Sequence, residues 1–587
     1  MEEFDFLIKN GLIVDGSGGE SFKGEISIIA DRIASVSKTP INGDAVNIID
    51  AKDQVVSPGF IDVHNHGDLS ILYYPRADGF VRQGITTFVG GQCGDSMGPF
   101  GDYIGLPWIH SDIYTDIDPH MYIKNWLQPR EIFNERHREI YGWDIDWRDL
   151  SEFHKRVMEK GLSPNMVPMV GHGDIRSLVM GTDFERSATD EEIANMAMET
   201  ENAMVEGCVG ITVGRDYDPG IWAEWKELVT CAKAAAKYGG IYASHSLRTG
   251  HRKPRRPGEP APVKTVGVIE ALNIGREASI PVQVSHLGVL YDVTPGGNRD
   301  VMAAAIRATL KLIDDAIADG VEADFDNIPH HLTGGISTSP WLIHSLNPWL
   351  HVSGSPEQLS KSLRMPDFRE EIKESILAGK HYGLNPNINP KWAGERVIVD
   401  CKVDAYLEKT VSEIAEETGV DELEALFDVI NADPYTRVIR RGEDDWVKLE
   451  FYKHPRAMIG VDTFAVDETR QSRTTPPSYP NQNSFGGFPR FLRRTVHETK
   501  VLSIQEAVHK ITGSPARKFR LKERGLLKPG FYADITIWDP ERITDKGTQL
   551  EPRQYPDGVN YVLINGDLVV DSCKHTGKLP GRVLYRT

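Results

Sequence analysis

The feature that most constrains the fold is the alternation of short apolar segments with helical stretches through the middle of the chain. Eight apolar segments of strand length recur there, at residues 60–63, 86–90, 165–170, 209–213, 240–243, 281–285, 321–326 and 457–461. Such alternation is typical of parallel strands that are joined by crossover helices. Eight of these units predict an α/β fold of the TIM type, a (β/α)8 barrel.

The two chain ends have a different texture, with short stretches in which apolar and polar residues alternate between turns. These stretches lie at residues 5–14, 24–29, 32–36, 46–49, 530–539 and 561–571. Alternation with a period of two predicts half-buried strands. We therefore expect residues 1–57 and 516–587 to build one small β-sandwich beside a barrel of residues 58–515.

Two insertions break the regular spacing of the barrel units, near residues 99–150 and 331–400. The first is rich in aromatic residues such as Trp108 and Trp143, and the second contains Trp341 and Trp349. Long connections of this composition suit either a lid over a substrate or a contact between identical subunits in a homo-oligomer. Both uses stay open.

Polar side chains follow nearly every predicted barrel strand. They are His64, His66, Cys93, His172, Tyr217, His245, His286, Asp326 and Asp462. Catalytic residues of such barrels lie at the C-terminal ends of the strands, so these side chains are expected to converge at one rim. The collective pattern is a stronger signal than any single residue.

A metal site is the first interpretation of this rim. Successive side chains on a strand alternate between faces, so His64 and His66 point the same way and can bind one ion. Cys93, in a glycine-rich loop, adds a sulfur donor, with a buried structural cysteine as the alternative. A mixed set of nitrogen, sulfur and oxygen donors predicts Zn²⁺ rather than magnesium or calcium.

Asp462 is the predicted general base. It follows the eighth strand, which lies beside the first strand in a closed barrel, so its carboxylate can reach the ion near His64 and His66. For His172 and Asp326, direct contact with the ion and a role in orienting a ligand are equally open. The other four cysteines, Cys208, Cys231, Cys401 and Cys573, are expected to be structural.

Composition and charge exclude several classes of function. A net charge of -19 argues against binding to nucleic acid, and the basic run at residues 251–256 contains proline, which is typical of a solvated loop or of a lip over an acidic ligand. No apolar run reaches the length of a membrane span, and the first residues are acidic where a secretory signal is basic. Five scattered cysteines suit a reducing compartment, so a cytoplasmic location is expected.

Several motifs together resemble the amidohydrolase superfamily, and within it the N-acyl-D-amino-acid deacylase (D-aminoacylase) branch. Besides the loop of Cys93, they are Lys9-Asn-Gly-Leu-Ile-Val-Asp-Gly16, Pro58-Gly-Phe-Ile-Asp-Val-His-Asn-His66, Gly171-His-Gly173, Glu506-Ala-Val-His-Lys-Ile-Thr-Gly-Ser-Pro-Ala516 and Arg524-Gly-Leu-Leu-Lys-Pro-Gly-Phe-Tyr-Ala-Asp534. The resemblance runs through most of the chain. It implies a metal-dependent hydrolase of carbon-nitrogen bonds other than peptide bonds, acting on a small-molecule amide.

The resemblance also implies roles for individual residues. One zinc is held tightly by Cys93, His245 and His286, and a second, weaker position is formed by His64, His66 and Asp462. Tyr217 polarises the substrate carbonyl, metal-activated water attacks it, and Asp462 moves the proton to the leaving amine. The default substrate is an N-acyl-D-amino acid or a related N-acyl compound.

Two departures from the family pattern predict an altered specificity. The family usually has lysine where this chain has Gly288, and a His-Pro-Arg segment where it has Tyr479-Pro-Asn481. A cation is the usual partner of a substrate carboxylate, and Arg215 and Arg248 are the candidates to replace the missing ones. For each of these arginines, a surface ion pair is the alternative.

Three alternative functions remain. A cyclic amide or ureide hydrolase, similar to hydantoinases or dihydroorotases, commonly carries a carboxylated lysine after the fourth strand, where this chain has Thr212-Val-Gly-Arg215. A hydrolytic deaminase would give Cys93 no equivalent role. A non-catalytic scaffold on the same barrel is the alternative outside enzymes, because fold alone does not imply function.

Overall fold

The eight predicted barrel segments all form strands. A computed structural model describes residues 3–105, 127–247, 264–291, 298–330, 341–378, 392–394, 396–440, 445–467, 481–548 and 551–586. In it the segments correspond to β6 (Phe60–Asp62), β7 (Ile85–Val89), β10 (Asn165–Val167), β11 (Val170–Gly171), β12 (Gly210–Gly214), β13 (Ile241–His245), β14 (Val282–Val284), β15 (Ala323–Asn327) and β18 (Ala457–Ile459). All their pairings are parallel.

These strands form two hydrogen-bonded sheets that follow chain order, β10-β7-β6 and β11-β12-β13-β14-β15-β18. The third predicted strand is divided into β10 and β11 at Pro168. Proline has no amide hydrogen to donate to a neighbouring strand, which explains the break in the ladder. The Pro168 carbonyl still accepts a hydrogen bond from Val209 N at 2.8 Å, so the two pieces stay next to the following strand.

The first and last strands of this series lie side by side. Val63 N donates to Ile459 O at 3.4 Å, and Asp462 N donates to His64 O at 2.9 Å. The buried Asp62 carboxylate adds a further bond across the seam, because it accepts from Val461 N at 3.1 Å. The seam places the His64-Asn-His66 segment directly against the segment that carries Asp462.

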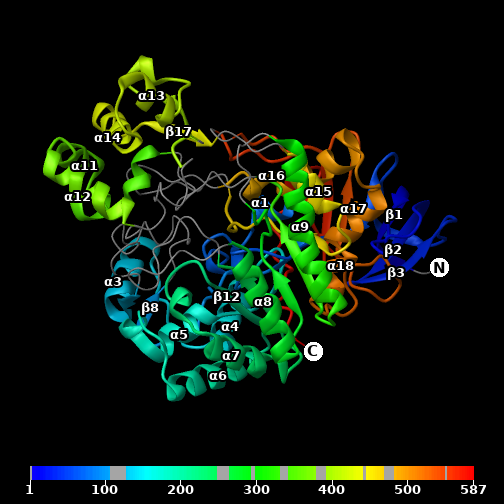
Figure 1. Cartoon of the computed structure of the whole chain (residues 1–587). Coiled ribbons are helices and arrows are strands. Elements are labelled where there is room, and N and C mark those ends of the chain that lie inside the picture. The colour runs from blue at the N-terminus through cyan, green and yellow to red at the C-terminus, as the bar shows by residue number, and fades with distance from the viewer. Residues whose placement is uncertain are drawn as a thin grey trace.

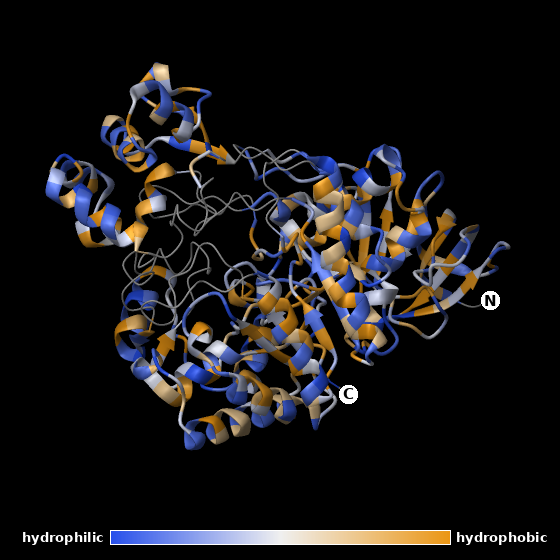
Figure 2. Ribbon diagram, in the orientation of Figure 1, coloured by the Kyte–Doolittle hydropathy of each residue, from blue (hydrophilic) through white to orange (hydrophobic). Residues whose placement is uncertain are grey.

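Amphipathic helices surround the strands (Figure 1). They include α4 (Leu150–Lys160), α5 (His172–Met180), α6 (Asp190–Val205), α7 (Trp225–Ala236), α8 (Lys264–Ala278), α9 (Arg299–Ala318), α15 (Trp446–Tyr452), α16 (Asn483–Leu492), α17 (Ile504–Ile511) and α18 (Gly513–Lys518). Both α6 and α17 begin with a capping box, in which Thr189 with Glu192 and Ser503 with Glu506 satisfy the first amides. Figure 2 shows the apolar residues concentrated on the strands and on the helix faces turned toward them.

Both chain ends contribute to one nine-stranded sheet. Its strands are β1 (Glu3–Ile13), β2 (Phe22–Ile29), β3 (Arg32–Ser37), β4 (Asp44–Asp50), β5 (Val55–Pro58), β19 (Ile535–Trp538), β20 (Val559–Ile564), β21 (Asp567–Asp571) and β22 (Lys574–His575). The antiparallel pairing of β5 with β19 joins the two ends. Ile8, Ile26, Ile535 and Leu563 are fully buried within this part. The two ends therefore share one sheet, while its separation into a sandwich domain stays a prediction.

The two predicted insertions differ in how they pack. In the first, β8 (Tyr103–Gly105), β9 (Leu127–Pro129) and α3 (Arg130–Tyr141) join the main core through Phe133 and Trp147. The second has a hydrophobic cluster of its own, from Leu342 to Val438, and so continues beyond residue 400. Its elements are η4 (Leu342–Leu346), α10 (Asn347–Ser353), α11 (Pro356–Ser362), α12 (Pro366–Leu377), β16 (Arg396–Asp400), α13 (Val411–Thr418), α14 (Glu422–Ala432) and β17 (Arg437–Arg440), at the upper left of Figure 1.

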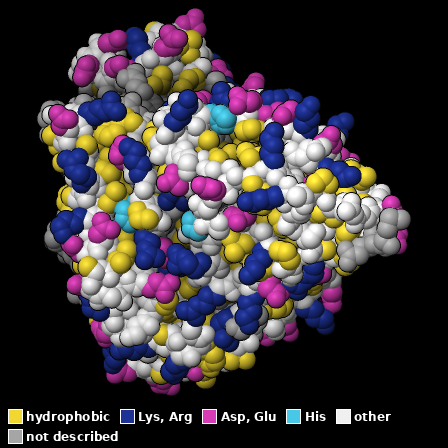
Figure 3. Space-filling view, turned by 90° about the vertical axis from the view of Figure 1, so that its right-hand side faces the viewer, with side chains coloured by type: hydrophobic (Ala, Val, Ile, Leu, Met, Phe, Trp, Pro, Cys, Tyr) yellow, Lys and Arg dark blue, Asp and Glu magenta, His cyan; other side chains and the backbone are white. Residues whose placement is uncertain are grey.

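The surface carries a mixture of charges. Basic and acidic side chains are interspersed over the face seen in Figure 3. In the part of the chain that the structure describes, none of the helices combines the length and apolar character that crossing a membrane requires.

Candidate metal centre

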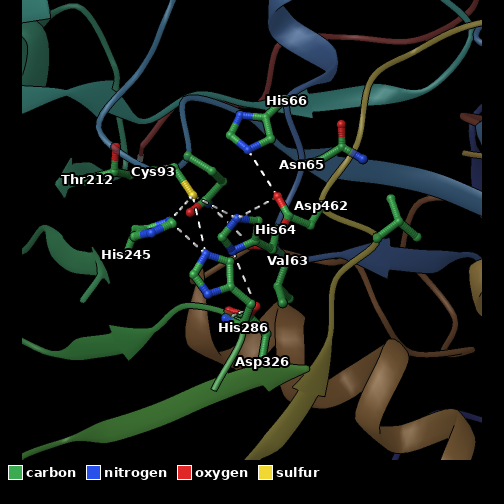
Figure 4. A network of polar contacts seen from close by, with 12 residues as sticks. Val63, His64, Asn65, His66, Cys93, Thr212, His245, His286, Asp326 and Asp462 are labelled. Atoms are coloured by element: carbon green, nitrogen blue, oxygen red, sulfur yellow. Dashed lines mark hydrogen bonds and ion pairs between the residues drawn. The ribbon is translucent and has the colours of Figure 1, made fainter. Parts of the chain in front are cut away.

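Two groups of potential metal ligands meet where the strands end (Figure 4). One group contains His64, His66, Cys93 and Asp462, and the other contains Cys93, His245 and His286. Within each group the donor atoms all lie within 4.8 Å of one another. Cys93 belongs to both groups, so its sulfur lies between them.

The Cys93 sulfur is the geometric centre of the arrangement. It lies 3.2 Å from His64 Nε2, 3.3 Å from His245 Nδ1 and 3.6 Å from His286 Nε2. The last two nitrogen atoms are 2.9 Å apart. Three imidazoles are thus directed at one thiol: His64 follows β6, His245 ends β13 and His286 follows β14.

Asp462 completes the first group from the eighth strand. Its Oδ1 atom lies 3.1 Å from His66 Nε2 and 3.4 Å from His64 Nε2. The Asp462 side chain is 10% exposed, whereas that of His64 is fully buried. The carboxylate therefore lies next to the potential ligands and is slightly exposed.

The backbone is in an unfavourable conformation at three of the six ligand residues. Cys93 has φ 58°, His286 has φ 36° and Asp462 has φ 50°, in the left-handed region that side chains other than glycine rarely adopt. Such conformations persist where the surrounding structure enforces them, and they cluster at functional sites. Next to Cys93, Gly94 has φ 88°, and a Cβ atom there would lie 2.5 Å from Gly214 N, which explains the glycine in this loop.

The charges of the ligand residues are coupled. Burial disfavours the Cys93 thiolate, but the imidazoles of His64 and His245 outweigh burial and hold the pKa of the thiol well below its usual value. Burial likewise opposes ionisation of Asp462, and His64 and His66 hold its pKa well below the usual range. Burial would lower the pKa of His66, but Asp462 and Cys93 raise it to about 9.

The donor chemistry of both groups fits zinc. A buried thiolate and a largely buried carboxylate cost free energy unless a cation accompanies them, and the raised pKa values of His64 and His66 favour protonated imidazoles in that role. A divalent ion can replace those protons, because metal binding requires the deprotonated thiol and neutral imidazoles. Sulfur and imidazole nitrogen are preferred zinc ligands.

Tyr217 lies beside the second group of potential ligands. Its hydroxyl donates to the backbone carbonyl of Cys93 at 2.5 Å, and its ring centroid is 5.0 Å from that of His245. Tyr217 is 4% exposed. The phenol is therefore held at the edge of the second ligand group.

His172 belongs to neither ligand group, although it follows the third strand as expected. It begins α5, and its Nε2 atom lies 2.8 Å from Glu227 Oε1 on α7. Arg176 also donates to both oxygens of Glu227. Burial opposes ionisation of Glu227, but His172 and Arg176 outweigh it and lower its pKa to about 2. The structure places His172 in a buried ion cluster that joins two helices.

This cluster gives a prediction about stability. Glu227→Ala leaves Arg176 buried without its carboxylate, so the free energy of unfolding should fall by about 3–5 kcal/mol, as expected when one partner of a buried pair is removed. The measurement is urea unfolding followed by circular dichroism. Asp190→Ala, which breaks the exposed ion pair with Lys226, is the control and should cost about 0–1 kcal/mol. Equal losses in the two variants would contradict the prediction.

Of the two predicted substrate arginines, one is already paired. Arg215 is 2% exposed, its Nε atom lies 2.8 Å from Glu270 Oε1, and its Nη1 atom donates to Gly220 O. Arg215 therefore forms an ion pair, as in the alternative, but the arginine itself is buried and Glu270 is partly exposed. Arg248 lies outside the described residues, as do Tyr479 and Pro480.

Two carboxylates contact ligand histidines without joining the ligand groups. Asp326 was predicted either to bind the ion or to orient a ligand, and its Oδ1 atom lies 3.2 Å from His64 Nδ1. Asp216 was not predicted, and its Oδ2 atom lies 3.4 Å from His245 Nε2. The signal that could have pointed to Asp216 is its position directly between Arg215 and Tyr217 after the fourth strand.

The chain is similar in sequence to known deacylases. A model described as "Amidohydrolase family" matches residues 476–570. The chain is 28% identical over 581 residues to an N-acyl-D-aspartate deacylase of Alcaligenes xylosoxydans xylosoxydans, covering 99% of this chain and 95% of that protein.

Solved structures of D-aminoacylase and of a related deacylase are similar to this chain over nearly its whole length. A structure of D-aminoacylase, described as having a binuclear metal centre, has a TM-score of 0.69 and 26% identity, covering 99% of this chain and 100% of the other. An N-acyl-D-glutamate deacylase from Bordetella bronchiseptica, complexed with zinc and a phosphonate inhibitor, has a TM-score of 0.68 and 25% identity, with full coverage of both chains.

Proposed function

Because this chain is an amidohydrolase that resembles the D-aminoacylases, we propose that it is a zinc-dependent hydrolase of the amide bond in N-acyl-D-amino acids or related N-acyl compounds. The observation that carries the proposal is the pair of ligand groups that share Cys93, with the slightly exposed Asp462 carboxylate beside them. The relatives that act on N-acyl-D-amino acids support this class of substrate.

The proposed architecture is a closed (β/α)8 barrel of residues 58–515 with a small β-sandwich from residues 1–57 and 516–587. The hydrogen bonds from Val63 to Ile459 and from Asp462 to His64 support closure of the barrel. The sheet shared by both chain ends supports the second domain. The insertion with its own cluster, from Leu342 to Val438, suits a lid or a subunit contact.

In the proposed metal centre, Cys93, His245 and His286 hold one zinc tightly, and His64, His66 and Asp462 form a weaker position that shares the Cys93 sulfur. The mixed donor sets and the zinc in the related N-acyl-D-glutamate deacylase support this assignment. When bound, zinc supplies a Lewis acid for the amide carbonyl and lowers the pKa of water near it.

The protein's own groups would then move the proton and position the substrate. Asp462 accepts a proton from the attacking water and delivers it to the nitrogen of the leaving amine, so the products are a carboxylate and an amine. Tyr217 is held beside Cys93 and His245, and its hydroxyl hydrogen would turn from the Cys93 carbonyl to the oxygen of the reacting carbonyl.

The test is a pooled panel of N-acyl-D-amino acids, N-acyl-L-amino acids, neutral amides and cyclic ureides, incubated with the zinc-loaded protein. Mass spectrometry of the products identifies every hydrolysed member, and the Asp462→Asn variant serves as the catalytically impaired control. Consumption of N-acyl-D-amino acids supports the proposal. Hydrolysis restricted to cyclic ureides, or release of ammonia from an amine, would contradict it.

Gly288 gives a prediction about substrate affinity. Among the described residues, no atom lies within 4 Å of a Cβ atom built at Gly288, so there is open space for the start of a side chain two residues after His286. Gly288→Lys adds a cation there, and we expect the KM for an N-acyl-D-amino acid to fall about tenfold, because a hydrogen bond to a charged group contributes about 1.5–3 kcal/mol.

The control for this prediction is Gly288→Met, which adds a side chain of similar length without the charge. Steady-state kinetics on the N-acyl-D-amino acid and on its neutral amide distinguish the two variants. The fall in KM should be confined to the lysine variant and to the anionic substrate. An equal change in both variants would mean that volume, and not charge, is responsible.

A further inference from the structure

Asp326 lies at the end of β15 and is completely buried. Its Oδ1 atom accepts a hydrogen bond from the backbone N of His286 at 2.7 Å, and its Oδ2 atom accepts one from Gln283 Nε2 at 2.8 Å. The same Oδ1 atom lies 3.2 Å from His64 Nδ1. Two bonds from β14 and its following turn therefore fix a carboxylate behind the imidazole of His64.

The two ligand residues that Asp326 contacts belong to different groups. His64 shares its group with His66 and Asp462, while His286 belongs to the group with His245. Figure 4 shows Asp326 below His64 and His286, on the side away from His66. The carboxylate is thus a direct physical link between the two proposed metal positions, in addition to the shared Cys93.

The contact with His64 is at the ring nitrogen that does not face the other ligands. His64 Nε2 is the atom close to Cys93 and Asp462, whereas Nδ1 faces Asp326. Among the described residues, none makes a well-aligned hydrogen bond to His64 Nδ1. The Asp326 carboxylate is the charged group that lies near this nitrogen. A carboxylate on the second nitrogen fixes the tautomer and the orientation of a ligand imidazole and makes it a stronger donor.

Asp326 also acts on the main chain of the second group. His286 has φ 36°, a strained conformation that needs an external restraint. The bond from His286 N to Asp326 Oδ1 is such a restraint, because it fixes the peptide immediately before the strained residue. One carboxylate thereby sets the ring of one ligand and the backbone of another.

We propose that Asp326 is a positioning residue that joins the two ligand groups, so that both metal positions depend on it. The inference rests on the proposed function, since it assumes that both groups bind metal. Asp216 provides a natural comparison. Its carboxylate lies 3.4 Å from His245 Nε2. Among the described ligand residues, His245 of the second group is the one that it contacts.

The experiment compares Asp326→Ala, Asp326→Asn and Asp216→Ala with the parent protein, each loaded with zinc. Competition with a chromogenic chelator gives the affinity of each bound zinc. Loss of an outer carboxylate partner typically weakens metal binding 10- to 100-fold, so Asp326→Ala should weaken both zinc positions by about 100-fold. Asp326→Asn keeps an acceptor oxygen but no charge, so it should weaken both by about tenfold. Asp216→Ala should weaken one position.

A second readout separates positioning from a general loss of structure. The cobalt(II)-loaded proteins report ligand geometry through their visible spectrum, including the charge-transfer band of the Cys93 thiolate. The Asp326 variants should shift this spectrum while their metal-free forms keep the circular dichroism of the metal-free parent. If Asp326→Ala does not fold, Asp326→Asn, which has nearly the same volume, carries the test.

The outcomes are distinguishable. Parent affinity at both positions in Asp326→Asn, with an unchanged cobalt spectrum, would overturn the inference. Weakening at one position only would also overturn it, because Asp326 would then serve a single group. Failure of the parent protein itself to bind zinc through these residues would instead contradict the proposed function.

Discussion

Asp462→Asn is expected to lower kcat by about 10³-fold while the tightly bound zinc stays in place, since general acid-base catalysis contributes about 10²–10⁴-fold. Asparagine keeps the shape of the side chain but cannot accept the proton of the attacking water. The group of Cys93, His245 and His286 does not include residue 462, so its zinc should remain. Steady-state kinetics and the zinc content of the same sample check both parts.

The control for this variant is Asp314→Asn, which changes an exposed carboxylate that is paired with His454 and belongs to neither ligand group. It should leave kcat and zinc content unchanged. Near-parent activity of Asp462→Asn would remove Asp462 from its role as general base. Loss of all zinc together with activity would mean that Asp462 is a ligand of the tight position.

The proximity of the six potential ligands could be predicted because each of them follows a strand whose apolar sequence is unambiguous. His64, His66 and Cys93 end the first two strands, and the parallel order of the sheet brings them to the same rim as His245 and His286. The position of a strand end can be predicted without side-chain rotamers, because the order and direction of the strands determine it. The predicted neighbourhood of Asp462 likewise needed only the adjacency of the first and last strands.

Other parts of the site depend on packing that periodicity does not encode. His172 follows its strand as predicted, but it begins α5, and its ring turns to Glu227 on α7 rather than to the ligands. Asp216 contacts His245 through space from a neighbouring strand end. The division of the third strand at Pro168 could have been anticipated, because proline interrupts a ladder.

The limits of the insertions were also hard to predict. The hydrophobic cluster of the second insertion continues to Val438, well past the expected boundary near residue 400. Its helices α13 and α14 have apolar faces like those that cover the barrel, so the sequence pattern does not tell which core they join. Tertiary contacts decide which core an amphipathic helix packs against. The apolar sequence pattern shows only that the helix packs against some core.

Cys93→Ala is expected to weaken zinc binding at both positions, because its sulfur is the donor that both ligand groups share. Loss of a direct ligand should cost more than the 10- to 100-fold typical of an outer partner, so we expect at least about a 100-fold decrease in affinity. The protein should also lose the stabilisation that bound metal provides, about 2.7 kcal/mol at a zinc concentration 100 times the parent Kd. Equilibrium dialysis and urea unfolding with and without zinc measure the two effects.

Two control variants make this prediction specific. Cys208→Ala changes another completely buried cysteine that belongs to neither ligand group, so its zinc affinity should equal that of the parent. His66→Ala removes a member of the first group only and should spare the position formed with His245 and His286. If Cys93→Ala loses one zinc and retains the other at parent affinity, the sulfur serves a single metal. The proximity of Cys93 to both groups would then reflect packing alone.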